Sequence, residues 1–189
     1  PLLGTQIDIV AQGKLAARAA DLALSEMARL EQLMSRYRND SEVAALHRAA
    51  GRHPVDVSPE TMAVLQQALT LSRESGGLFD ITIGAYDGWS FKPGSPRLPS
   101  AQERREQRHL VDHRQLHTDP ERGQAQLMRR GMKLDLGGVA KLPILEAGMR
   151  VLKSHGLDGA MINGGGDVLV TGQLDGRDWR IGLRDPANP

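Results

Sequence analysis

Apolar residues recur every three or four positions in several stretches, and this spacing predicts α-helices. The longest stretch spans residues 14–34, where alanine, leucine and methionine fill one face, so its methionines are expected in the core. A second helix is predicted to begin at Ser58-Pro59, because serine is a good N-cap and proline fits the first turn. It ends at Gly76-Gly77. Shorter helices are predicted from Asp40 or Ser41 to Arg48, over 101–108 and over 143–154.

Alternating or continuous apolar runs between these helices predict β-strands. The expected strands cover residues 2–10, 78–84, 133–137, 160–163, 168–171 and 179–183, with a short extended piece at 51–57. Residues 110–127 predict a hairpin-like excursion around 119–123, and Asp175-Gly176 predicts a tight hairpin turn. This order of elements predicts the α+β class, with mixed sheets flanked by helices in a single domain over residues 1–189.

Composition narrows the classes of function. Apolar residues make up 40% of the 189 residues, and the formal net charge of +1 gives no global attraction to nucleic acid. Aromatic residues are only 3%, which disfavours base-stacking surfaces, and the absence of cysteine excludes disulfides and thiolate chemistry. The basic spots at 104–108 and Arg129-Arg130 are expected to be solvated surface. Because the chain begins at Pro1 without methionine, we expect that a preceding segment was removed.

Two junctions between a predicted strand and a glycine run carry the candidate chemistry. Lys133 to Lys141 reads KLDLGGVAK, and Met161 to Asp167 reads MINGGGD. Glycines let backbone N–H groups approach a phosphate-bearing ligand, although glycine runs also serve simply as turns. The acids Asp80, Asp135 and Asp167 fall at such junctions, where a carboxylate either satisfies turn N–H groups or accepts hydrogen bonds from a ligand.

Other groups of residues give weaker evidence for a functional site. His109, His113 and His117 recur every fourth residue, which would suit a metal site on one helix. The residues between them and Asp119-Pro120 oppose such a helix, so surface histidines are the favoured interpretation. The chain has no serine–histidine–acid set that could be assembled from sequence, no phosphate-binding loop of nucleotide kinases and no dinucleotide fingerprint.

An ordered set of segments resembles one family, the ApbE-type FAD:protein FMN transferases, also described as thiamine biosynthesis lipoprotein-like. The matching segments are LGT at 3–5, MSRYRNDSE at 34–42, GLFDITIG at 77–84, WSF at 89–91, LDLGGVAK at 134–141, NGGGD at 163–167, and Trp179 to Leu183 followed by Asp185-Pro186. Each segment is modest alone, but together they run in the family's order along the whole chain.

The resemblance implies that FAD binds in a cleft, that magnesium assists cleavage of its pyrophosphate, and that FMN passes to a threonine of a partner protein. By motif position it implies flavin contacts from Leu3, Tyr37, Leu78, Phe79, Asp80, Asp135 and Lys141. It also implies that Gly138 offers a backbone carbonyl to magnesium. No catalytic residue is assigned. The family habit further implies a periplasmic location or a membrane anchor on the periplasmic side.

Two departures from the family pattern affect these expectations. Leu142-Pro143 follows Lys141 where the family usually has a small residue and an aromatic. The family's C-terminal segments, which carry the side-chain ligands for magnesium, are expected to lie outside these residues. Three interpretations therefore stay open: an FMN transferase domain, a non-catalytic FAD-binding module or carrier, and a fragment that assembles with a separate C-terminal piece. Because the absence of the C-terminal segments would leave part of the ligand exposed, this chain is expected to bind FAD at micromolar strength or weaker.

Overall fold

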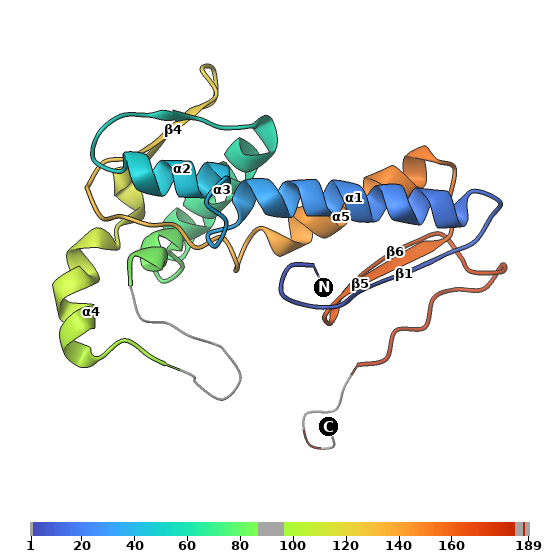
Figure 1. Ribbon diagram of the computed structural model, residues 1–189. Helices are drawn as coiled ribbons and strands as arrows, with labels where there is room; N and C mark the ends of the chain where they lie inside the picture. The colour runs from blue at the N-terminus through green and yellow to red at the C-terminus, as the bar shows by residue number, and fades with distance from the viewer. Residues whose placement is uncertain (1, 87–96, 184–186, 188–189) are drawn as a thin grey trace. The chain divides into compact units, whose positions relative to one another are not determined.

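The computed structural model describes residues 2–86, 97–183 and 187 (Figure 1). The chain forms two compact units, one from residues 1–29 and 142–189 and the other from residues 30–141, so the boundary falls inside the first helix. Both units combine helices with a small sheet, which confirms the α+β class, and every strand pairing in these two sheets is antiparallel. The segments at 89–91 and 185–186 lie outside the described residues.

The first unit is built on a three-stranded sheet. Its strands are β1 (Ile7–Ala11), β5 (Ala160–Gly164) and β6 (Asp167–Thr171), in the order β1-β5-β6. They lie side by side in Figure 1, next to helix α5 (Lys141–Ser154). The central strand buries alternate residues, including Ile162, and a Cβ at Gly164 would meet the side chain of Leu145 of α5 at 2.8 Å. Glycine in β5 therefore lets α5 pack closely on the sheet.

Helix α1 (Ala16–Met34) crosses α5 at a second small residue. The buried face of α1 carries Ala19, Ala23 and Met27, all fully shielded from solvent. A Cβ at Gly148 of α5 would lie 2.8 Å from the sulfur of Met27, so glycine makes room for the methionine at this crossing. The expected methionine-lined core face of this helix is confirmed.

The second unit packs two helices on another three-stranded sheet. The strands β2 (Val55–Asp56), β4 (Gln124–Leu127) and β3 (Leu116–Asp119) run in the order β2-β4-β3. Helix α2 (Glu42–Ala49) contacts β2 and β4, and helix α3 (Pro59–Glu74) contacts β3. The unit also contains α4 (Ala101–Gln107) and three short 3₁₀ turns: η1 (Ile81–Ala85), η2 (Arg108–Leu110) and η3 (His113–Gln115). Its core side chains include Val43, Leu46, Leu65, Ile81, Leu116, Leu127, Met132 and Leu134.

The predicted helix caps and turns are confirmed. The side chain of Ser41 accepts from the backbone N of Ala44 at 2.9 Å, and that of Ser58 accepts from Thr61 at 3.3 Å. Strands β3 and β4 form the expected hairpin around residues 120–123. The Asp175-Gly176 turn has positive φ at both residues, 50° and 70°, as a type I′ hairpin turn requires.

Three predicted strands are wrong. Residues 78–84 form no strand, because Asp80 caps the 3₁₀ turn η1 instead. Residues 133–137 are irregular, since their backbone N–H groups bond to a histidine side chain, to the carbonyl of Ile81 and to the carboxylate of Asp135 rather than to a neighbouring strand. Residues 179–183 are also irregular, although the indole N–H of Trp179 donates to the carbonyl of Thr171 at 3.0 Å. The first strand begins at Ile7 rather than at residue 2.

Candidate functional site

Three loops meet in the second unit, and they contain most of the residues that the sequence singled out. They are the segment after α1 (35–37), the segment before η1 (78–80) and the segment before α5 (134–140). A Cβ at Gly84 would lie 2.5 Å from the carbonyl carbon of Leu134, so only glycine allows this approach of two backbones. The N–H of Asp135 donates to the carbonyl of Ile81 at 2.7 Å and fixes the two segments together.

Asp135 joins the first loop to the third. One oxygen of its carboxylate accepts from Nη1 of Arg36 at 2.5 Å, and the other accepts from the backbone N of Gly137 at 2.9 Å. Arg36 also donates through Nη2 to the carbonyl of Gly84 at 3.3 Å. The two side chains are 21% and 36% exposed, so this pair is partly shielded from water while one side of the carboxylate stays accessible.

Asp80 joins the second loop to the turn η3. Its Oδ1 accepts from the backbone N of Thr82 at 2.8 Å and from the hydroxyl of Thr82 at 2.6 Å. Its Oδ2 accepts from the backbone N of His113 at 2.8 Å and lies 3.2 Å from the Nδ1 atom of the same residue. The interpretation of Asp80 and Asp135 as acids that satisfy turn N–H groups is thus confirmed, and their contact with a ligand stays a prediction.

One of the three regularly spaced histidines does not lie where the sequence predicted. The side chain of His113 is only 16% exposed and faces Asp80, so the prediction that it lies on the surface is wrong. His109 and His117 are exposed, as expected. Among residues 2–86 and 97–183, no group of three or more histidines and carboxylates is placed to hold a metal ion.

The side chain of His47 in α2 fixes the backbone of the third loop. Its Nε2 accepts from the backbone N of Leu134 at 2.7 Å, a bond that only the neutral ring can make. Burial lowers the pKa of His47 to about 4, and the nearby charges of Arg36 and Lys133 act in the same direction. The ring is therefore neutral at ordinary pH and acts as a fixed acceptor one residue before Asp135.

Apolar and aromatic side chains surround the two acids. Tyr37 is 83% exposed, with the guanidinium of Arg36 lying 5.7 Å from the centre of its ring. Leu78 is 94% exposed. The ring of Phe79 lies against Gly138, where a Cβ would come within 3.2 Å of it. Exposed large apolar groups beside fixed hydrogen-bond acceptors are typical of a surface that binds a flat heterocycle.

The remaining predicted residues lie elsewhere. Lys141 is half-buried and begins α5, so the helix starts two residues earlier than predicted and keeps Pro143 in its first turn, where proline is tolerated. Leu3 lies in the first unit, in a turn closed by a bridge between Leu2 and Thr5. Gly165 and Gly166 have positive φ and form the turn between β5 and β6, which confirms the simple connecting role for this glycine run.

The sequence did not predict that three residues tether the loops of this site: Arg36, His47 and His113. Arg36 and Asp135 are separated by 99 positions, His47 and Leu134 by 87, and Asp80 and His113 by 33. Arg36 lies inside the MSRYRNDSE segment and His113 belongs to the histidine repeat, but neither pattern indicated the partner that the side chain has in the structure. Side chains that tether one loop to another leave no local pattern, because their partners are set by the tertiary fold.

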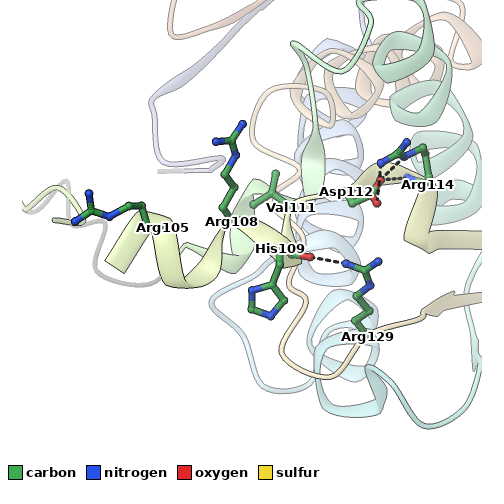
Figure 2. A pocket seen from close by; sticks show the side chains of 7 residues that line it. All are labelled: Arg105, Arg108, His109, Val111, Asp112, Arg114 and Arg129. Carbon is green, nitrogen blue, oxygen red and sulfur yellow. Dashed lines mark hydrogen bonds and ion pairs between the residues drawn. The ribbon is translucent and has the colours of Figure 1, made fainter. Parts of the chain in front are cut away.

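Next to this site the structure contains an open pocket of about 520 Å³. It is lined by Arg105, Arg108, His109, Val111, Asp112, Arg114 and Arg129 (Figure 2). None of the residues that the sequence assigned to the flavin lines it. The two basic spots expected to be separate solvated surface therefore contribute to one concave surface.

Comparison with known proteins decides the family. Residues 3–189 match the family model described as the ApbE family. The chain belongs to the ApbE family. Its relatives with assigned names include the FAD:protein FMN transferase of Treponema pallidum (strain Nichols), which is 30% identical over 98% of this chain and 56% of that protein. The FAD:protein FMN transferase of Klebsiella pneumoniae (strain 342) is 31% identical over 84% of this chain and 49% of that protein.

Solved structures agree with this assignment. The crystal structure of the ApbE protein from Thermotoga maritima matches with a TM-score of 0.87 and 26% identity, over 98% of this chain and 62% of that one. The ApbE-like fold predicted from the motifs is therefore confirmed. The chain spans about half the length of the curated relatives it matches.

Asp80→Asn tests the cap of this ApbE site. An amide offers one acceptor oxygen, so its NH₂ group would face the N–H of either Thr82 or His113 and leave a part-buried donor without an acceptor. We expect the free energy of unfolding to fall by about 1–3 kcal/mol. The control is Asp21→Asn on the exposed face of α1, which should change stability by less than about 0.5 kcal/mol. Equal urea midpoints for the two variants would contradict this account of Asp80.

The pH dependence of stability tests His47. Its folded pKa of about 4 lies below the ordinary value of 6.5, so its contribution to stability is complete above pH 6.5. The contribution is lost as pH falls towards 4, because the unfolded chain takes up the proton first. Between pH 7 and 4.5 we expect a loss of about 2 kcal/mol from this group. Urea unfolding of His47→Gln at both pH values should lack this component; an identical pH dependence in both proteins would show that His47 is not the cause.

Proposed function

We propose that this chain is the flavin-binding part of an FAD:protein FMN transferase. The observation that supports this most strongly is the tethering of three loops around Asp80 and Asp135, with Tyr37 and Leu78 exposed beside them. A surface of this kind is ready to cover an isoalloxazine ring and to accept hydrogen bonds from its polar edge. The names of the relatives from Treponema pallidum and Klebsiella pneumoniae support the same activity.

In this proposal each acid has two tasks. Arg36 and the Gly137 N–H hold Asp135, and Thr82 and His113 hold Asp80, so both carboxylates are oriented before FAD arrives. A carboxylate oxygen has two lone pairs, and the accessible ones can accept from flavin N–H or from ribose hydroxyls. Because the acceptors are already ordered, binding costs less conformational entropy at these side chains.

Phosphoryl transfer then requires charge compensation at the pyrophosphate. The threonine hydroxyl of the acceptor loses its proton to water and attacks the phosphorus of the FMN half, the pyrophosphate P–O bond breaks, and AMP leaves. Lys141 supplies positive charge in the segment that follows Gly137-Gly138. Magnesium would stabilise the charge on the leaving phosphate when it is bound.

The described residues do not make a magnesium site by themselves. Magnesium prefers octahedral oxygen coordination with one or two carboxylates. Gly138 offers one carbonyl oxygen, Asp135 is engaged by Arg36, and no further cluster of acids or histidines exists in the described part of the chain. We propose that the remaining ligands come from segments outside these residues, such as those that the longer relatives possess.

A second candidate is a non-catalytic FAD-binding module or carrier of the same fold. The Leu142-Pro143 pair after Lys141 favours it, whereas the arrangement around Asp80 and Asp135 is shared by both candidates. A periplasmic location, either free or anchored, remains part of the proposal. None of the described helices is long and apolar enough to cross a membrane.

FAD titration with Leu78→Ala tests the proposed flavin surface. Leu78 is 94% exposed, so its truncation should leave the unfolding free energy within about 0.5 kcal/mol of the parent. The side chain would be covered by the flavin, so FAD binding should weaken by about fivefold to tenfold. The measurement is flavin fluorescence in equilibrium dialysis, at FAD concentrations up to the millimolar range.

Leu183→Ala is the matched control, because Leu183 is 93% exposed and lies in the other unit. We expect it to leave FAD affinity unchanged. Saturable binding weakened by Leu78→Ala alone supports the proposal. Absence of saturable FAD binding by the parent chain, or equal effects of the two variants, would overturn it.

A further inference from the structure

The pocket beside the candidate flavin site is lined mainly by arginines. Arg105 and Arg108 come from α4 and η2, Arg114 comes from η3, and Arg129 follows β4, so several elements contribute arginines to the lining of one open hollow of about 520 Å³. Figure 2 shows these side chains together with His109 and Asp112. A concave surface with this composition is basic.

Most of this positive charge has no compensation within the pocket. Asp112 is the only acid in the lining, and it is bound by Nε and Nη2 of Arg114 at 2.7 and 3.2 Å. The hydrogen bond from Arg114 lowers the pKa of Asp112, so the pair stays ionised and contributes no net charge. Arg129 donates Nη1 to the carbonyl of His109 at 2.8 Å, which orders its guanidinium without neutralising it.

The side chains of Arg105 and Arg108 are exposed, and their guanidinium groups make no hydrogen bond or ion pair with any residue in the described ranges. Three guanidinium charges, those of Arg105, Arg108 and Arg129, therefore share one hollow whose single acid, Asp112, is paired with Arg114. Guanidinium groups bind carboxylates and phosphates through paired N–H donors, so an anionic partner would relieve their mutual repulsion.

Hydrogen bonds connect the wall of the pocket directly to the segment that contains Asp80 and Thr82. The backbone N of Asp112 donates to the hydroxyl of Thr82 at 2.8 Å, and the backbone N of His113 donates to Asp80 at 2.8 Å. The wall of the pocket and the cap of η1 are therefore connected through adjacent residues. A partner bound in the pocket would lie beside the proposed flavin surface.

We propose that this arginine pocket docks an acidic segment of the acceptor protein, and this inference rests on the proposed transferase function. Its lining contains no phenylalanine, tyrosine or tryptophan, and His109 is its only aromatic ring, so it offers no extended platform on which successive nucleobases could stack. All four arginines are exposed, whereas a small-molecule site usually encloses most of its ligand. A protein carrying several carboxylates matches both the spread of the charges and their exposure, and it would bring its threonine to the flavin side of the unit.

Binding of a defined acidic peptide tests the docking surface without requiring FAD or catalysis. The probe is a short fluorescein-labelled peptide rich in glutamate, measured by fluorescence anisotropy at low and at physiological salt. The test variant combines Arg105→Glu and Arg108→Glu. The matched control combines Arg18→Glu and Arg177→Glu, which changes the net charge equally at exposed positions of the other unit.

We expect saturable, salt-sensitive binding that weakens about tenfold or more in the test variant and less than about twofold in the control. A peptide with glutamine in place of glutamate should not bind. Equal weakening in both variants, or no binding to the parent chain, would overturn the proposal. A single-stranded oligonucleotide that binds more tightly than the peptide would also overturn it, as would displacement of the peptide by equimolar inorganic pyrophosphate.

We expect FAD affinity to be unchanged in the variant that combines Arg105→Glu and Arg108→Glu. FAD binding and peptide binding therefore test the transferase proposal and the docking proposal separately. If the parent chain binds the peptide but not FAD, the flavin proposal fails and the docking of an acceptor loses its basis. If it binds FAD but not the peptide, only the docking surface is wrong.

Discussion

The ion pair between Arg36 and Asp135 is the interaction on which the candidate site depends. The surface around it consists of loops and a 3₁₀ turn, so no sheet ladder fixes its shape. Arg36 reaches from the end of α1 to both Asp135 and the carbonyl of Gly84, and thereby joins the first loop to the third loop and to η1. Because the pair is only partly shielded from water, its contribution to stability is modest, and its main effect is to select one arrangement.

This arrangement explains how two acids that hold the loops together can also accept hydrogen bonds from a ligand. Asp80 and Asp135 each accept bonds from the protein, and these bonds orient the carboxylates rather than exhausting their lone pairs. His47 adds a neutral acceptor behind Leu134, which fixes the backbone leading into Asp135. The exposed Tyr37 and Leu78 then supply apolar contact area next to polar groups of fixed orientation.

The sequence predicted what depends on local chemistry, including the helices capped by Ser41 and Ser58, the β3–β4 hairpin and the Asp175-Gly176 turn. It failed where tertiary contacts decide the backbone. Residues 78–84 are apolar enough for a strand, but Asp80 captures the N–H of Thr82 and starts a 3₁₀ turn. Motif resemblance indicated the family and the acids, whereas the tethers from Arg36, His47 and His113 required the fold, because each joins positions distant in sequence.

Amide hydrogen exchange of the chain with and without FAD tests the central claim that the second unit presents a preformed flavin surface. Without FAD, the bonded amides of Thr82, His113 and Leu134 should already be protected. With FAD, we predict added protection over residues 78–82 and 134–141 and little change in the β3–β4 hairpin. Unprotected amides in the free chain, or FAD-induced protection confined to other segments, would contradict the account.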